Sequence, residues 1–267
     1  GTVLPSSVAS TIQLAMVVLA VVLLAGVGSG WLVAAYEFPG RSWLAWALVL
    51  PLSMPAFVLA YAYTDFFDTS GPFQSWLREL TGWAVREYWF PDIRSLPGAG
   101  LVLGLALYPY VYMLARSAFA ERSPSLAEAA RSLGLHARLV WWRVTWPVAR
   151  PAVAAGCALV LMETLADFGT VTYFGVDTLT AAIYRSWQGL GDRVAAARLA
   201  FVLLAMVGLL VFLERRQRQR MRFYARGTKH APRALLEGAA GWRAFALCSL
   251  PVVLGFVLPA LLLVRAW

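Results

Sequence analysis

Six apolar stretches separated by polar segments dominate the pattern along this chain. They run over about residues 9–35, 43–64, 99–118, 150–168, 195–213 and 244–264. Most are long enough to cross the hydrocarbon core of a bilayer as a helix, which takes about 20 residues. Because a helix satisfies its own backbone hydrogen bonds in lipid, the pattern predicts an all-α, polytopic transmembrane helical bundle.

Prolines and small residues modify two of these stretches. Pro51 and Pro55 interrupt the second stretch and Pro109 lies within the third, so we expect kinks there. Gly100 and Gly104 are four residues apart on the third stretch, where they would let a neighbouring backbone approach closely.

The composition agrees with a membrane protein. The 267 residues are 60% hydrophobic and 14% charged, with a mean hydropathy of +0.66, whereas a soluble domain carries about a quarter charged residues. In a soluble protein the net charge of +9 would hint at nucleic-acid binding. Here the basic residues lie between the apolar stretches, so they are better explained by orientation in the membrane, and we expect no nucleic-acid partner.

The distribution of positive charge predicts which loops are cytoplasmic. Segments 36–42, 116–150 and 214–243 hold 16 of the 23 lysines and arginines, and segments 1–8, 65–98, 169–198 and 265–267 hold the other seven. By the positive-inside rule the first set is cytoplasmic and the N-terminus is outside. That orientation is expected if one preceding span is missing, so we read the chain as a piece of a longer protein.

Two of the polar segments have distinctive compositions. Segment 65–98 is the longest external loop, and its tryptophans and acids suit an interfacial helix at the headgroups, or else a docking surface for an external protein. Segment 214–243 is a basic linker that could also contact anionic lipid. The aromatic residues of the external loop are Trp76, Trp83, Trp89 and Phe90.

The cysteines and histidines do not predict a reactive site. Cys157 and Cys248 each lie inside an apolar stretch, where small buried side chains are expected. His136 and His230 lie in basic loops without a second ligand at metal spacing, so we assign no metal site.

The cytoplasmic segment 121–150 predicts two short helices. Ser125 and Glu128 form a capping box at the start of the first helix, and Gly134 lies where a helix end favours a left-handed residue. A second helix fits 136–146, with Leu139, Trp142 and Trp146 on one side. Pro147 and Pro151 then predict that the fourth span begins as a new helix.

This segment resembles the cytoplasmic loop of permease subunits in binding-protein-dependent ABC importers. The family pattern is Glu-Ala-Ala, three residues, Gly, nine residues, a branched aliphatic residue, one residue, Leu and Pro. Trp146 replaces the usual Leu but keeps an apolar residue. The matching positions are Glu128, Ala129, Ala130, Gly134, Val144 and Pro147, and Arg131 lies among them.

The resemblance implies a fold, a role and partners. It implies the type I importer permease fold and a loop that inserts into a cleft of a separate ATP-hydrolysing subunit. We expect this coupling role for Glu128, Ala129, Ala130, Arg131, Gly134, Val144 and Pro147. The other expected partners are a periplasmic solute-binding protein, a second permease half and membrane lipid, with the chain in the bacterial inner membrane.

Two acids near the end of the fourth apolar stretch are candidates for the solute pathway. Glu163 and Asp167 are four residues apart, so they should share a helix face. Intramembrane acids usually face a water-filled interior or a cation. The alternative is a buried ion pair between helices, for which Arg185 or Arg198 would supply the cation.

The sequence around these acids is similar to the ferric-iron subfamily of these permeases. The segments that carry this similarity are 161–175, 178–180 and 183–185. Members of that subfamily often hold two six-span halves in one chain. Residues 1–213 would then be a first half lacking its first span, 214–243 a linker, and 244–267 the first span of the second half. Related members carry thiamine, sulfate, phosphonates or polyamines, so these remain alternatives to ferric iron.

The sequence offers no site for ATP or for catalysis. It holds no Gly-x-x-x-x-Gly-Lys-Ser/Thr segment after a strand, so ATP should bind the partner subunit and the chain is not expected to be an enzyme. Two rival functions remain: a secondary transporter with Glu163 and Asp167 as a cation relay, and an intramembrane enzyme for which only these two acids qualify.

Overall fold

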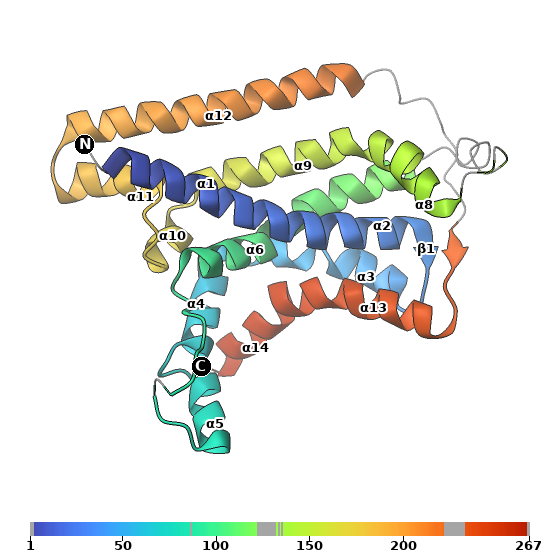
Figure 1. The fold of residues 1–267 in the computed structure, drawn as a ribbon, viewed down its shortest axis with the longest axis horizontal. Coiled ribbons are helices and arrows are strands. Elements are labelled where there is room, and N and C mark those ends of the chain that lie inside the picture. The colour runs from blue at the N-terminus through green and yellow to red at the C-terminus, as the bar shows by residue number, and fades with distance from the viewer. Residues whose placement is uncertain are drawn as a thin grey trace.

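The computed structural model is a bundle of helices with two very short strands, and it describes residues 3–85, 87–121, 132, 134, 136–221 and 233–265 (Figure 1). In chain order the elements are α1 (Val3–Val22), η1 (Leu23–Val27), α2 (Gly28–Ala35), β1 (Tyr36–Glu37), α3 (Arg41–Ala47), η2 (Leu50–Ser53), α4 (Ala56–Phe67), α5 (Pro72–Thr81), α6 (Leu96–Ala120), α8 (Ala137–Val140), η3 (Trp141–Thr145), α9 (Trp146–Ala166), α10 (Gly169–Tyr173), α11 (Leu179–Tyr184), η4 (Arg185–Gly189), α12 (Arg193–Met221), β2 (Ala234–Leu235), α13 (Gly238–Val252), η5 (Val253–Val257) and α14 (Leu258–Arg265).

Five of the six expected spans are confirmed as long apolar helices. Within the described residues, the helices long and apolar enough to cross a membrane are Leu4–Ala35, Leu96–Ala120, Trp141–Ala166, Arg193–Arg216 and Gly238–Arg265. All five begin earlier than the hydropathy pattern predicted, and the helix that starts at Trp141 does so by nine residues. The loops between the spans gather at two ends: β1, α8 and β2 lie at one end, and the N-terminus and α11 at the other (Figure 1).

The second apolar stretch is a broken element instead of the kinked span that we predicted. The helical segments Arg41–Ser53 and Ala56–Thr81 meet at an angle of 90°. Pro55 removes a backbone N–H and forces the preceding residue, Met54, into an extended conformation, so the helix cannot continue. After the break, α4 and α5 project sideways from the bundle (Figure 1).

Side chains of α6 support the broken element near its start. The Tyr112 hydroxyl donates to the carbonyl of Ala45 at 3.0 Å, and the Arg116 guanidinium donates to the same oxygen at 3.2 Å. A carbonyl near a broken helix needs such partners inside a bilayer, where an unsatisfied polar group is costly.

The centre of the bundle is α6, and neighbouring backbones approach it through glycines. A Cβ atom added at Gly26 would lie 2.9 Å from Cβ of Val111, one added at Gly156 would lie 3.0 Å from Cα of Val111, and one added at Gly255 would lie 2.9 Å from the carbonyl oxygen of Leu105. Small residues at such crossings let helices pack backbone to backbone.

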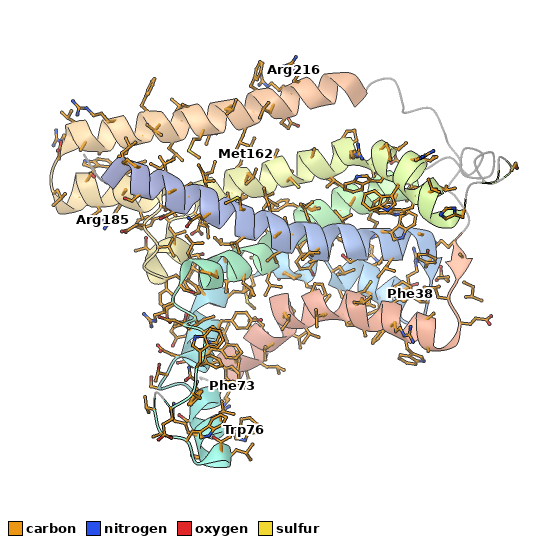
Figure 2. All side chains as sticks on the ribbon, in the orientation of Figure 1. Phe38, Phe73, Trp76, Met162, Arg185 and Arg216 are labelled. Atoms are coloured by element: carbon orange, nitrogen blue, oxygen red, sulfur yellow. The ribbon has the colours of Figure 1, made fainter. Side chains whose placement is uncertain are left out.

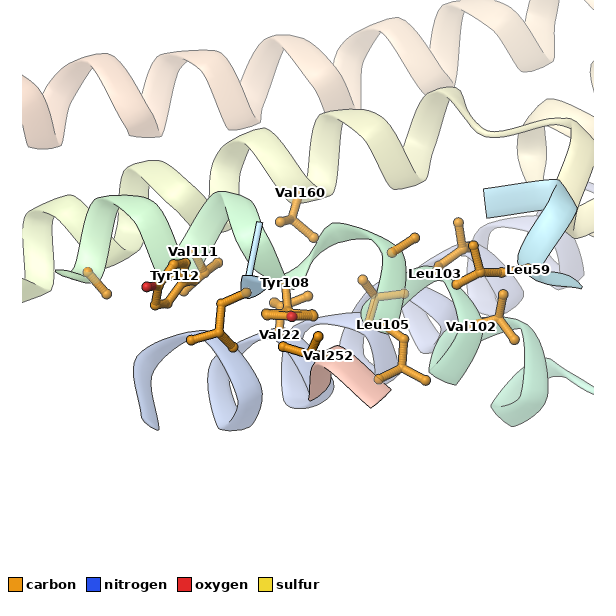
Figure 3. Packing of buried hydrophobic residues seen from close by; sticks show 14 of the residues in the cluster. Val22, Leu59, Val102, Leu103, Leu105, Tyr108, Val111, Tyr112, Val160 and Val252 are labelled. Atoms are coloured by element: carbon orange, nitrogen blue, oxygen red, sulfur yellow. The ribbon is translucent and has the colours of Figure 1, made fainter. Parts of the chain in front are cut away.

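The glycines of α6 itself accommodate α1, as the sequence predicted. A Cβ at Gly100 would lie 2.5 Å from Cγ1 of Val17, and one at Gly104 would lie 2.6 Å from Cβ of Val21. Figure 3 shows the resulting core, with side chains from α1, α9 and α13 around α6.

The last helix packs into this same core. Cys248 of α13 is fully buried, as expected for a small apolar side chain, and the Tyr63 hydroxyl of α4 donates to the carbonyl of Leu254. At the opposite end of the helix, β2 pairs in parallel with β1. Glu37 of β1 lies 3.7 Å from the guanidinium of Arg41 and 3.6 Å from that of Arg233, so the end of the basic linker is fastened beside the first span.

Two glycines of the first span provide a matched test of the packing on α6. We predict that Gly26→Ala destabilises the protein by about 1–3 kcal/mol, because its Cβ would meet α6, whereas no atom lies within 4 Å of a Cβ at Gly28. Gly28→Ala should therefore be neutral or stabilising by up to about 1 kcal/mol through helix propensity. Thermal unfolding in detergent measures both, and equal shifts would contradict the packing described here.

Candidate functional site

The first candidate site is the loop between α6 and α9, of which the structure describes a part. Glu128, Ala129, Ala130 and Arg131, together with the predicted capping box, lie outside the described residues. Gly134 is described: it is exposed, it has a φ of +81°, and a Cβ there would have nothing within 4 Å. The predicted left-handed conformation of this glycine is confirmed.

The second half of the loop is continuous with the fourth span. We predicted that the helix over 136–146 would end before the span begins as a new helix, and this prediction is wrong. α8, η3 and α9 form one helix from Ala137 to Ala166, and η3 is a π-helical turn in which the Trp146 N–H donates to the carbonyl of Trp141. Pro147 therefore lies in an uninterrupted helix. The wider π turn provides a reason, because it re-pairs the backbone just before a residue that has no N–H.

Aromatic rings join this π turn to the rest of the bundle. The ring of Trp141 stacks on Trp146 with centroids 5.7 Å apart and planes at 13°, and it meets Trp31 of α2 edge to face at 6.1 Å. Trp31 in turn meets Phe119 of α6 at 5.1 Å. We call Trp31, Phe119, Trp141 and Trp146 the aromatic cluster.

The aromatic cluster differs from the face that the sequence predicted. We expected Trp142 to lie on the same side as Trp146, but Trp142 is 53% exposed and its ring contacts that of Trp141. Val144 is half-buried beside the buried Thr145. Sequence reasoning missed Trp141, although the paired tryptophans at 141 and 142 were visible.

The second candidate site is the pair of acids at the end of α9, and the structure separates them. Asp167 follows the last residue of α9 and turns toward α10, where its carboxylate accepts hydrogen bonds from the Thr170 hydroxyl and the Val171 N–H, both at 3.0 Å. Glu163 is exposed on α9. The prediction that the two acids share a helix face is wrong, because the helix ends before Asp167.

Burial also distinguishes Asp167. It raises the pKa of the Asp167 carboxyl, the hydrogen bonds from α10 lower it, and the nearby Glu163 raises it further. The proposed ion pair with Arg185 is also wrong, because Arg185 pairs with the exposed Asp177 (Figure 2 shows Arg185 at the edge of the bundle).

The segment that resembles the ferric-iron subfamily holds α9, α11 and α1 together. The Leu179 N–H donates to the Thr11 hydroxyl of α1 at 3.0 Å, and the Thr180 hydroxyl donates to the carbonyl of Leu165 in α9 at 2.6 Å. The Thr178 hydroxyl accepts from the Ala181 N–H and begins α11. These threonines are therefore structural groups at the junction of three helices.

An exposed stripe on α4 lies beside α10, and it was not predicted. A Cβ at Gly169 would lie 3.4 Å from Cβ of Phe57, and the rings of Tyr61 and Tyr173 are 6.4 Å apart. The stripe could not be placed from the sequence, because its position depends on the 90° break. Its residues, spaced four apart on α4, are Phe57, Tyr61 and Asp65.

The external loop contains the expected short helix, α5. Phe73 packs against Phe66, Phe67 and Phe90, whereas Trp76 remains 55% exposed (Figure 2 labels Phe73 and Trp76). The buried Gln74 also fastens α5 to α4, because its side-chain amide donates to the carbonyl of Phe67. An amphipathic helix with outward aromatics agrees with an interfacial position.

Comparison with known proteins places these features in one family. Residues 23–223 match the family described as binding-protein-dependent transport system inner membrane component. The Fe(3+)-transport system permease protein FbpB 2 of Haemophilus influenzae is 26% identical over 189 residues, which cover 71% of this chain and 33% of that protein. The sulfate transport system permease protein CysT of Escherichia coli is 27% identical over 193 residues, 70% of this chain and 66% of that protein. The molybdenum transport system permease protein ModB of Escherichia coli is 29% identical over 205 residues, which cover 73% of this chain and 86% of that protein.

Solved structures support the fold. A chain of a bacterial alginate ABC transporter superposes with a TM-score of 0.59 at 16% identity, covering 83% of this chain and 81% of that one. A chain of the MetNI methionine ABC transporter gives a TM-score of 0.58 at 17% identity, covering 82% of this chain and 96% of that one. The expected all-α permease fold is confirmed. The chain spans only a third of the length of FbpB 2.

Substitutions at Asp167 test its role as a helix cap. Asp167→Ala should destabilise the protein by about 1–2 kcal/mol, because α10 loses the acceptor for the Thr170 hydroxyl and the Val171 N–H, and Asp167→Asn should cost less because its amide oxygen still accepts. The control is Asp177→Ala, which removes an exposed ion pair worth about 0–1 kcal/mol. Thermal unfolding in detergent would contradict this role if Asp167→Ala were no worse than the control.

Proposed function

Because the chain belongs to the family of binding-protein-dependent transport system inner membrane components, we propose that it forms the solute pathway of an ATP-driven importer and couples to a separate ATPase through the loop Glu128–Pro147. The chain is a multi-pass inner membrane permease component. ATP binds to the partner subunit and drives alternating access. The loop links the closure of the ATPase dimer to the arrangement of the membrane helices.

The observation that carries this proposal is the conformation of Gly134 within the matched motif. Gly134 adopts a left-handed conformation in open space, three residues before a continuous helix that runs from Ala137 into the fourth span. A rigid connection of this kind transmits displacement from a bound partner to a membrane helix. The side chains expected to enter the partner's cleft are those of Glu128, Ala129, Ala130 and Arg131.

The proposed complex contains a second permease half and an external binding protein. Residues 1–213 form the first half, 214–243 the linker and 244–267 the first span of a second half. The match to one third of FbpB 2 supports a longer chain, and the fastening of the linker by β1 and β2 agrees with a junction between halves. A periplasmic solute-binding protein would dock outside, where the aromatic loop 65–98 lies.

Ferric iron is the proposed solute. The segments 161–175, 178–180 and 183–185 and the relative named for Fe(3+) transport support it. Glu163 adds a chemical reason, because an exposed carboxylate on a membrane helix attracts a cation and repels an oxyanion. Sulfate and molybdate, which name two other relatives, and thiamine, phosphonate or polyamine remain alternatives of the same transport class.

The pathway itself is proposed to run past Glu163. We include in it the exposed stripe Phe57, Tyr61 and Asp65 on α4, which lies beside α10. Asp167 contributes by holding α10 in place. A secondary transporter with Glu163 and Asp167 as a relay is less well supported, because the carboxylate of Asp167 is engaged by Thr170 and Val171.

A charged side chain at Gly134 tests the coupling role. Gly134→Asp should leave membrane insertion intact and abolish both co-purification with the ATPase and ATP-dependent uptake, because no atom lies within 4 Å of a Cβ at this position whereas the new carboxylate would meet the partner's cleft. Gly82→Asp is the matched control: Gly82 also has a positive φ, of +73°, and open space, but it lies in the external loop. Normal uptake by Gly134→Asp, or equal loss in the control, would refute the coupling role.

Neutralising Glu163 tests the pathway and the solute. With ferric iron and its binding protein, Glu163→Gln should lower uptake about tenfold or more while ATPase docking persists, because the attraction for the cation is lost. Glu79→Gln, an exposed acid on α5, serves as the control and should transport normally. Parallel assays with sulfate and molybdate decide the solute class: faster uptake of either oxyanion by Glu163→Gln than by the wild type would overturn the cation proposal.

A further inference from the structure

The aromatic cluster connects the cytoplasmic loop to two other helices at once. Trp141 opens the π turn η3, and its ring lies 6.1 Å from Trp31 of α2 at an interplanar angle of 80°. Trp31 meets Phe119 of α6 at 5.1 Å and 77°. These are edge-to-face contacts, the favoured arrangement of aromatic rings, and Phe119 is almost fully buried.

The two helices that receive these contacts pack closely on each other. A Cβ at Gly30 of α2 would lie 3.1 Å from the backbone nitrogen of Arg116 and 3.2 Å from Cβ of Ala115, both in α6. Such close packing leaves no room for α2 to slide independently of α6, since interiors at this density transmit displacement. A displacement of Trp31 would therefore displace both α2 and α6.

The π turn sets the direction of Trp141. In a regular helix, residues four apart share a face and Trp142 would align with Trp146, but bonding from i to i+5 aligns Trp141 with Trp146 instead, as their stacked rings show. The turn thus places one tryptophan inward and leaves its neighbour, Trp142, outward.

We propose that Trp141 is a positioning residue through which displacement of the cytoplasmic loop reaches α2 and α6. This inference rests on the proposed function, because it presumes that an ATPase moves the loop. Trp141 does not touch solute or nucleotide in this scheme. It fixes the angle between the loop and the helices behind it, so a smaller side chain would let the loop move while α2 and α6 stay still.

The test compares ATP use with transport in the assembled complex. Wild type, Trp141→Leu, Trp141→Phe and Trp142→Ala are reconstituted with the ATPase in proteoliposomes, with ferric iron and its binding protein as the transport probe. Trp141→Leu keeps an apolar side chain in case Trp141→Ala fails to fold. The measurements are ATPase co-purification, the rate of ATP hydrolysis and the iron transported per ATP hydrolysed.

We expect Trp141→Leu to retain the ATPase and hydrolyse ATP, but to transport about tenfold or more less iron per ATP. Trp141→Phe should restore much of the ratio because it keeps an aromatic ring, and Trp142→Ala should match the wild type. An unchanged ratio in Trp141→Leu, or an equal loss in Trp142→Ala, would overturn the inference. If the wild type neither binds the ATPase nor needs ATP, the proposed function itself fails, which is a distinct outcome.

Discussion

Backbone contact with α6 is the interaction on which the other features of this molecule depend. Inside a bilayer, lipid tails solvate apolar side chains as well as a neighbouring helix does, so helices associate through close packing and hydrogen bonds. Glycines at 26, 156 and 255 bring three different helices against α6 without intervening side chains. Therefore α6 fixes the positions of three helices: the one that carries the cytoplasmic loop, the first span and the helix that contains Gly255.

The sequence located the helices well but not their deviations from regular geometry. Five spans and the left-handed Gly134 followed from hydropathy and turn chemistry, because both signals are local. The angle of the break at Pro55 did not, since a proline specifies an interruption without an angle, and the support that α6 gives to the carbonyl of Ala45 is a contact between residues distant in the sequence. The exposed stripe on α4 is a consequence of that angle.

The same limit explains the errors at both candidate sites. Residues were assigned to a helix face by spacings of three and four, which assumes an unbroken α-helix. One π turn or one helix end makes such an assignment wrong. At η3 the extra residue exchanged the roles of Trp141 and Trp142. At Asp167 the helix had already ended, so a residue expected to line a pathway caps a neighbouring helix. Glu163 lies within regular helix and is exposed.

The burial of the last helix has a bearing on how the protein is made. α13 covers a face built by α2 and α3, and its continuation packs on α4 and α6, yet it is synthesised after all of these helices. The earlier spans therefore wait in the translocon with that face open to lipid until residues 238–265 arrive. The burial of Cys248 and the Tyr63–Leu254 contact can form only then, so the core around α6 is closed by a segment that is synthesised after α12.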